Sequence, residues 1–220
     1  MAGQPLWTME RGTLWVLDLA GALPPRVMPR IPVTFGEVSA EFSESLTRAM
    51  GLPTADEICR RQSTGRRCFA AWDGDQIVTY GWLSRGRECV GELEREFRFP
   101  PDDGYIWNCA TLPAYRQQGL YSALVGYMAG QAREQGAPRV WIGAARANVS
   151  SWRGFARAGF QPAIELTYAR FLSLRLTWIS GSGAASADVV AAARHALATD
   201  HEARRGALAV ALRGAACTLP

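Results

Sequence analysis

The residues with the clearest chemical potential lie between Tyr105 and Tyr121. A β-rich apolar run, 105–112, stops at Pro113, and a short polar stretch then leads into Gly119, where a helix is expected to begin. The first N–H groups of a helix have no partner within the helix and lie at the positive end of its dipole, and a glycine there lets the backbone approach a phosphate closely. The spacing therefore predicts a site that grips a pyrophosphate without a metal or a lysine. A plain connection between a strand and a helix is the alternative interpretation.

This loop resembles the pyrophosphate loop of the GNAT superfamily of acyltransferases, which has the form Q/R-x-x-G-x-G/A. The residues that carry the match are Arg116, Gln117, Gln118, Gly119, Leu120 and Tyr121. The loop departs from the pattern at its last position, where Tyr121 replaces a small residue. Downstream, the family has an Asn, a small residue three positions later, usually a Tyr seven later, and Gly-Phe at eleven and twelve. The corresponding residues are Asn148, Ser151, Phe155, Gly159 and Phe160.

The resemblance covers about residues 68–170 and implies the GNAT fold. That fold is an α/β domain with a mixed, mostly antiparallel central sheet, a splayed strand pair and flanking helices. The implied reaction is direct attack of an amine on the thioester of acetyl-CoA, without a metal. An amine acceptor, on a small molecule or a peptide, is therefore the implied partner.

The resemblance also assigns roles within the site. Backbone groups of Cys109, Ala110, Thr111 and Leu112 would pair with the pantetheine arm, and the N–H of Ala110 or Thr111 would hold the tetrahedral oxyanion. The amides of 117–121 would hold the pyrophosphate, with Arg116 beside them. Asn148, Ser151 and Phe155 complete the predicted cofactor-binding set. A plain capping role is an equal alternative for Asn148, and a buried packing role is the ordinary interpretation of Cys109.

The general base is not identified by the sequence. The family usually has a Glu near the start of the strand, where this chain has Tyr105, and a tyrosine with an ordinary pKa near 10 is a poor base at neutral pH. Asn108, acting through water, joins Tyr105 and Ala110 in the predicted catalytic set. The acidic alternatives are Glu92, Glu94, Asp102 and Asp103. A solvated acidic face is the ordinary interpretation of these residues, and such a face would attract a cationic amine.

Phe155 stands where the family usually has a Tyr that protonates the departing thiolate. An alkyl thiol with a pKa near 8.5 is already a tolerable leaving group, so we expect catalysis without that acid, with water or Tyr168 as substitutes. On this hypothesis Phe155→Tyr keeps or raises turnover.

The elements that must position these residues follow from local patterns. Two β-rich runs around Asp73-Gly74-Asp75 predict a hairpin. Thr34–Met50 has helical spacing that ends at Gly51, and Thr54 with Glu57 suggests a capping box for a second helix. The alternating pattern at 88–99 favours an exposed strand, with a charged helix as the alternative. The other expected strands are a short one at 14–19 in an otherwise irregular 1–32, and those at 105–112, 139–144 and, as a strand-like run, 160–178. The other expected helices are at 119–134 and 148–158.

Composition limits the remaining choices. The chain has 220 residues and a net charge of +4, and its basic residues, all Arg, form no block, so nucleic-acid binding is not expected. Its five cysteines are odd in number and form no C-x-x-C pair, which favours a reducing cytoplasm over a disulfide framework or a zinc site. No stretch is apolar enough to suggest a membrane span. We expect one domain at 1–180 and an Ala-rich tail at 181–220 that is dispensable for the fold, and the sequence leaves a homodimer open.

Two functions from different classes remain. The first is an acyl-CoA-dependent N-acyltransferase, with acetyl-CoA as the donor. The second is a non-catalytic module of the same fold that binds acyl-CoA for sensing or scaffolding. Release of free CoA thiol in the presence of amines discriminates between them.

Overall fold

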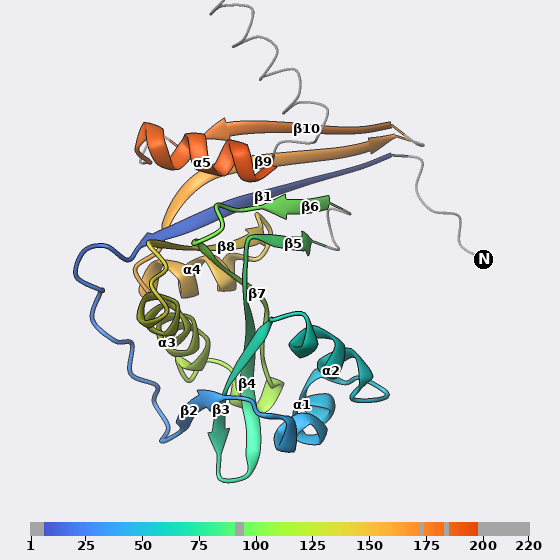
Figure 1. Cartoon of the computed structure of the whole chain (residues 1–220), viewed down its shortest axis with the longest axis vertical. Helices are drawn as coiled ribbons and strands as arrows, with labels where there is room; N and C mark the ends of the chain where they lie inside the picture. Colours follow the sequence, from blue (N-terminus) through green and yellow to red (C-terminus); the bar gives the residue numbers. More distant parts are fainter. Residues whose placement is uncertain (1–6, 91–94, 172–173, 183–184, 198–220) are drawn as a thin grey trace, which may run out of the picture.

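A computed structural model describes residues 7–90, 95–171, 174–182 and 185–197 of the chain (Figure 1). The strands are β1 (Trp7–Asp18), β2 (Thr34–Glu37), β3 (Arg67–Asp73), β4 (Gln76–Arg85), β5 (Arg87–Val90), β6 (Arg95–Arg98), β7 (Gly104–Thr111), β8 (Arg139–Ala145), β9 (Gln161–Phe171) and β10 (Leu174–Gly181). The helices are α1 (Ser43–Met50), α2 (Asp56–Ser63), α3 (Leu120–Glu134), α4 (Val149–Arg157) and α5 (Ala187–Leu197), with short 3-10 helices η1 (Ala40–Phe42) and η3 (Pro113–Tyr115).

The larger sheet has the strand order β10-β9-β1-β8-β7-β4-β3-β2, and β5 pairs with β6 in a separate ribbon. Of the neighbouring pairs in the larger sheet, β7 and β8 are parallel and the others are antiparallel. This confirms the predicted mixed, mostly antiparallel α/β fold. The predicted hairpin is also present as β3 and β4, with Gly74 in the left-handed conformation (φ 57°) that an Asp-Gly turn favours.

The helices form two layers around the sheet (Figure 1). On one face, α3 and α4 cover a core that includes Trp15, Leu17 and Ile142. On the opposite face, α5 covers Leu14 and Val16, while α1 and α2 cover the β3–β4 end. Successive side chains of a strand point to opposite faces of the sheet. In β1 the side chains on both faces are apolar, because helices cover both faces where this strand lies between β8 and β9.

Several local expectations were wrong. The segment 34–50 is not one helix, because its first part pairs with β3 as β2 and only Ser43–Met50 is α-helical. Gly51 does cap that helix in the left-handed conformation (φ 66°). The capping box at Thr54 is absent: its hydroxyl donates to the Asp56 carboxylate, and no side chain caps α2. The N-terminal region, expected to be largely irregular, contributes the 12-residue strand β1.

The C-terminal part also differs from expectation. The run 160–178 contains two paired strands, β9 and β10, and not a single one. Helix α5 packs against β6 and β9 and buries Ala193, Ala196 and Leu197. This packing argues against the predicted dispensability of the segment after residue 180, which a truncated chain would test. The division of the chain at residue 180 itself stays a prediction.

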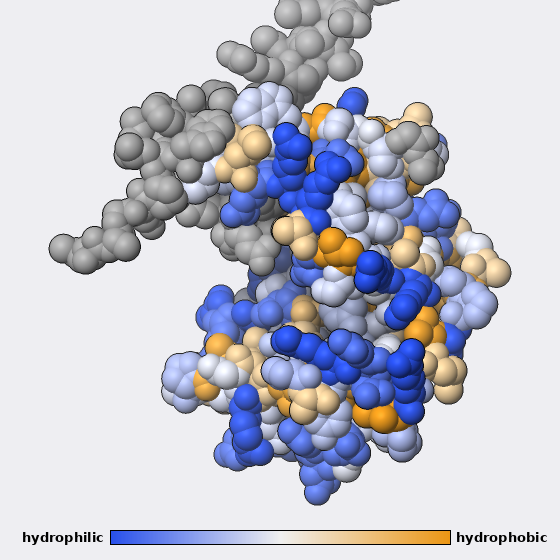
Figure 2. Space-filling model, turned by 180° about the vertical axis from the view of Figure 1, so that it is seen from behind, coloured by the Kyte–Doolittle hydropathy of each residue, from blue (hydrophilic) through white to orange (hydrophobic). Residues whose placement is uncertain are grey.

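The surface seen in Figure 2 is mainly hydrophilic, with hydrophobic residues scattered between the polar ones. Over the described ranges, no helix is both long and apolar enough to cross a membrane. Within the same ranges, no group of three or more His, Cys, Asp or Glu side chains is placed to hold a metal ion.

Candidate active site

A cleft of about 1350 Å³ opens where β7 and β8 part. The two strands pair only over Gly104–Ile106 and Val140–Ile142, and beyond these residues they diverge. The described lining residues are Met9, Glu10, Arg11, Gly12, Thr13, Leu14, Arg61, Phe97, Tyr105, Ile106, Trp107, Asn108, Cys109, Tyr121, Ile142, Gly143, Ala144, Ala145, Arg146, Ala147, Asn148, Ser151, Leu166 and Tyr168. Six of the predicted site residues are among them: Tyr105, Asn108, Cys109, Tyr121, Asn148 and Ser151.

A β-bulge in β7 shapes the open side of the cleft. The pairing with β4 shifts between Tyr80 and Trp82, and Asn108 adopts a left-handed conformation (φ 45°) that Asn tolerates better than most residues. The bulge directs the Cys109 side chain into the core, where a Cβ on Gly81 would lie only 2.6 Å from its Sγ. Burial raises the pKa of this thiol to about 12. Cys109 is therefore a packing residue and not a nucleophile.

The register after the bulge decides which backbone amide of β7 faces the gap between β7 and β8. The Leu112 N–H donates to the Val78 carbonyl at 2.9 Å, and Ala110 lies opposite Tyr80 in the same ladder. Because neighbouring residues of a strand direct their backbone groups to opposite sides, the Ala110 amide faces β4, and the Thr111 amide faces away from it. Of the two predicted oxyanion donors, the geometry favours Thr111 and disfavours Ala110.

The loop before α3 has an unusual backbone, which is compatible with the predicted anion site. Gln117 (φ 64°) and Gly119 (φ 79°) are both left-handed, and Gly119 caps a 15-residue helix with no acidic residue in its first turn. Successive turns of this kind direct N–H groups into one concavity. Outside the loop, the Arg30 N–H donates to the Gln118 carbonyl at 2.8 Å. Arg116 is exposed, and its Nε lies 3.3 Å from the Thr111 carbonyl oxygen, so its side chain stands between the loop and β7.

Tyr121, which replaces the small residue of the family pattern, is accommodated by Gly154 of α4. A Cβ on Gly154 would lie 2.6 Å from the Tyr121 ring, so the large side chain fits only because position 154 has none. The ring lies 6.1 Å from that of Phe155, centroid to centroid. Burial raises the pKa of the Tyr121 hydroxyl, and Ser151 opposes this shift only in part. Tyr121 therefore presents a protonated hydroxyl, able to donate a hydrogen bond, on the cleft wall.

Phe155 lies behind this wall. It is fully buried and packs edge-on against Trp15 at 5.8 Å between ring centroids. It is absent from the described lining of the cleft. Thr111 and the loop 116–120 are also absent from that lining, but Phe155 differs from them in its complete burial. Contact of Phe155 with the cofactor stays a prediction that this burial disfavours.

Asn148 caps α4. Its Oδ1 accepts hydrogen bonds from the Ser151 N–H at 3.1 Å and from the Ser150 hydroxyl at 2.9 Å. The capping interpretation is confirmed, and contact of Asn148 with the pantetheine arm stays a prediction.

The acidic residues proposed from the sequence do not supply an obvious base. Asp103 is fully buried, accepts from Trp141 Nε1 at 2.8 Å and pairs with Arg139, so it is structural. Tyr105 is 5% exposed and stacks on Phe99 at 4.6 Å. Asp102 is exposed and not among the cleft residues, and Glu92 and Glu94 lie outside the described residues.

Glu10 is the carboxylate that sequence reasoning missed. It is exposed, and it is the single acidic residue among the described residues that line the cleft. It pairs across the sheet with Tyr168, whose buried hydroxyl has no hydrogen-bond partner within the described chain. No local signal marks Glu10, because it reaches the cleft only through the insertion of β1 between β8 and β9.

Comparisons with known proteins identify the family to which the chain belongs. The model of the acetyltransferase (GNAT) family matches residues 37–160, and the chain therefore belongs to this family of N-acetyltransferases. Uncharacterized N-acetyltransferases of Mycobacterium bovis and Mycobacterium tuberculosis are 28% identical over 143 residues, which are 64% of this chain and 74% of theirs.

Solved structures show the same fold. A GNAT-family acetyltransferase from Colwellia psychrerythraea has a TM-score of 0.52 at 13% identity, covering 80% of this chain and 57% of that one. A GCN5-related N-acetyltransferase from Sphaerobacter thermophilus has a TM-score of 0.54 at 15% identity, covering 74% and 52%. This chain thus spans little more than half the length of either structure. The family implies acetyl-CoA as the acyl donor.

Proposed function

We propose that the protein transfers the acetyl group of acetyl-CoA to an amine by direct attack, within the cleft between β7 and β8. The observation that carries this proposal is the divergence of these strands beside the left-handed loop at Gln117 and Gly119. The loop amides would hold the pyrophosphate, and the pantetheine arm would run along the open edge of β7.

In the proposed reaction the amine lone pair attacks the thioester carbon, and the carbonyl oxygen becomes an oxyanion. The Thr111 amide is the proposed donor to that oxyanion, because its register turns it away from β4. The carbon–sulfur bond then breaks, and CoA leaves as a thiolate that takes a proton. Tyr121 is the proposed donor of a hydrogen bond to this sulfur, since its raised pKa keeps the hydroxyl protonated.

The amine must lose a proton during the reaction. Glu10 is the proposed acceptor, acting through water, because it is the carboxylate on the described cleft wall. Its cross-strand neighbour Tyr168 lies on the same face of the sheet. These two residues would therefore lie on the acceptor side, opposite the face that α3 and α4 cover.

Calorimetry with acetyl-CoA tests the binding site. In Gly119→Asp the added Cβ would lie 3.6 Å from the Met28 carbonyl oxygen and 3.7 Å from the Pro29 Cα, and the new carboxylate would repel a pyrophosphate held by the loop, so we expect affinity to fall about tenfold or more. Gly136→Asp is the matched control, since Gly136 has the same left-handed conformation (φ 81°) at the other end of α3, and a Cβ added there would have no neighbour within 4 Å. Equal affinities in both variants would contradict the assignment.

Release of CoA thiol with a panel of amines tests the reaction. Release that depends on the amine supports transfer. Tight binding of acetyl-CoA without release for every amine would instead support the non-catalytic module.

A further inference from the structure

A partly buried arginine lies on the cleft wall formed by α2. The side chain of Arg61 is 15% exposed, and its guanidinium carbon lies 5.1 Å from the centre of the Trp82 ring and 4.7 Å from that of Trp107. The other charged residues on the described wall of the cleft are exposed, namely Glu10, Arg11 and Arg146. Arg61 is thus the cleft cation that is largely withdrawn from water, where electrostatic interactions are stronger.

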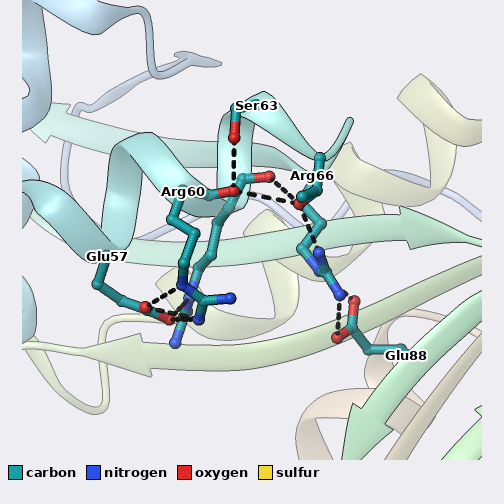
Figure 3. Close-up of polar contacts among 7 residues, drawn as sticks. Glu57, Arg60, Ser63, Arg66 and Glu88 are labelled. Atoms are coloured by element: carbon teal, nitrogen blue, oxygen red, sulfur yellow. Dashed lines mark hydrogen bonds and ion pairs between the residues drawn. The ribbon is translucent and has the colours of Figure 1, made fainter.

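The positive charge of Arg61 is only partly balanced. Its Nε donates to Glu57 at 2.7 Å, but the same carboxylate is also held by Arg60 through contacts of 2.9, 2.8 and 2.6 Å (Figure 3). Hydrogen bonds from Arg61 and Arg60 lower the pKa of Glu57, so the carboxylate stays ionised. Two arginines and one carboxylate leave a net charge of +1 in this group.

The positive charge of the neighbouring Arg66 is balanced by a different carboxylate, that of Glu88. Arg66 lies 6.0 Å from the centre of the Trp107 ring, and it forms an ion pair with Glu88 at 2.8 Å (Figure 3). Glu88 is 4% exposed, so that pair is largely buried. The surplus charge next to the cleft therefore belongs to the Glu57 group and not to Arg66.

One donor of Arg61 has no acceptor. Its Nη1 is buried and makes no hydrogen bond within the described chain. An indole face attracts a cation but accepts a hydrogen bond only weakly, and a buried donor without an acceptor is costly. A carboxylate matches the planar edge of a guanidinium with two parallel hydrogen bonds. A ligand carboxylate on the cleft side of the guanidinium would balance the charge, and it would also bond the buried Nη1 once the side chains that cover this atom move aside.

We propose that the acceptor of this acetyltransferase is an amine that also carries a carboxylate, as an amino acid does, and that Arg61 binds this carboxylate. The inference rests on the proposed function, because it concerns the acceptor of the same cleft. A bare ammonium would be repelled by Arg61, whereas a zwitterion offers it an anion. Phe97 and Trp107 provide an apolar wall for the acceptor side chain.

The test compares L-phenylalanine with L-phenylalaninamide as acceptors, by thiol release at saturating acetyl-CoA, in the wild type and in Arg61→Gln. The two amines differ in basicity, but this difference cancels when the acid-to-amide ratio of kcat/KM is compared between proteins. We expect the ratio to fall about tenfold or more in Arg61→Gln, mainly through a higher KM for the acid. Arg61→Lys, which keeps the charge but not the planar fork, should fall between them.

Arg48→Gln is the matched control, because Arg48 is an exposed residue of α1 with the same change of charge. Its ratio should equal that of the wild type. The melting temperature and acetyl-CoA affinity of each variant establish that it is folded. Two outcomes overturn this inference and leave the proposed function in place. One is an unchanged acid-to-amide ratio in Arg61→Gln. The other is a wild-type protein that acetylates amides and simple amines but no amine with a carboxylate. Failure to release thiol with any amine overturns the proposed function as well.

Discussion

Gly154 offers a direct test of how the two halves of the site pack together. An added Cβ would lie 2.6 Å from Cδ1 and 2.9 Å from Cε1 of the Tyr121 ring. Carbon atoms in contact prefer about 3.5–4.0 Å, so the ring must move by about 1 Å. Alanine in place of a helical glycine normally stabilises by about 1 kcal/mol, whereas overpacking costs about 1–3 kcal/mol. We therefore expect Gly154→Ala to leave the free energy of unfolding unchanged or to lower it by up to about 2 kcal/mol.

The controls are Gly126→Ala and Gly130→Ala, both in α3, where an added Cβ would have no neighbour within 4 Å. Each should raise the free energy of unfolding by about 0.5–1 kcal/mol, as measured by denaturant titration. Because Tyr121 lines the cleft, Gly154→Ala should also weaken acetyl-CoA binding, while the controls should not. A gain in stability equal to that of the controls, with unchanged affinity, would refute the packing of Tyr121 against α4.

Three further outcomes are expected. Ala193→Asp places a carboxylate at a fully buried position of α5 and should lower the free energy of unfolding by about 2–4 kcal/mol. The control Ala191→Asp, at an exposed position of the same helix, should change it little. Equal melting temperatures of the two variants would show that α5 does not dock. Phe155→Tyr should lower the free energy of unfolding by about 1–3 kcal/mol without raising turnover, because the new hydroxyl would enter the core. A faster enzyme with an unchanged free energy of unfolding would contradict the buried placement. Iodoacetamide at pH 8 should alkylate exposed Cys59 faster than the partly exposed Cys109, because a pKa raised to about 12 keeps the Cys109 thiol protonated until the pH approaches that value; equal labelling in peptide mass spectrometry would contradict that raised pKa.

The backbone of the proposed acyl-CoA side could be predicted from the sequence because its determinants are local. A left-handed glycine before a helix and an Asn that caps the next helix are properties of a few consecutive residues. The motif spacing also located the strand β7 to within one residue at either end.

The acceptor side could not be predicted in this way. Glu10, Arg61 and Tyr168 come from three distant parts of the chain and meet only through the strand order. Arg61 looks like an ordinary surface arginine of a polar helix until the indole rings of Trp82 and Trp107 are placed beneath it.

The sequence by itself thus determined the family, the general fold and the left-handed turn before α3, because turn and cap chemistry is fixed by neighbouring residues. Only the tertiary structure decided that β1 inserts between β8 and β9, that α5 completes the core, and that the Thr111 amide rather than that of Ala110 faces the gap between β7 and β8. The physical reason is that strand order, burial and the side to which an amide points depend on long-range pairing. A one-residue change of register reverses that direction without any change in composition.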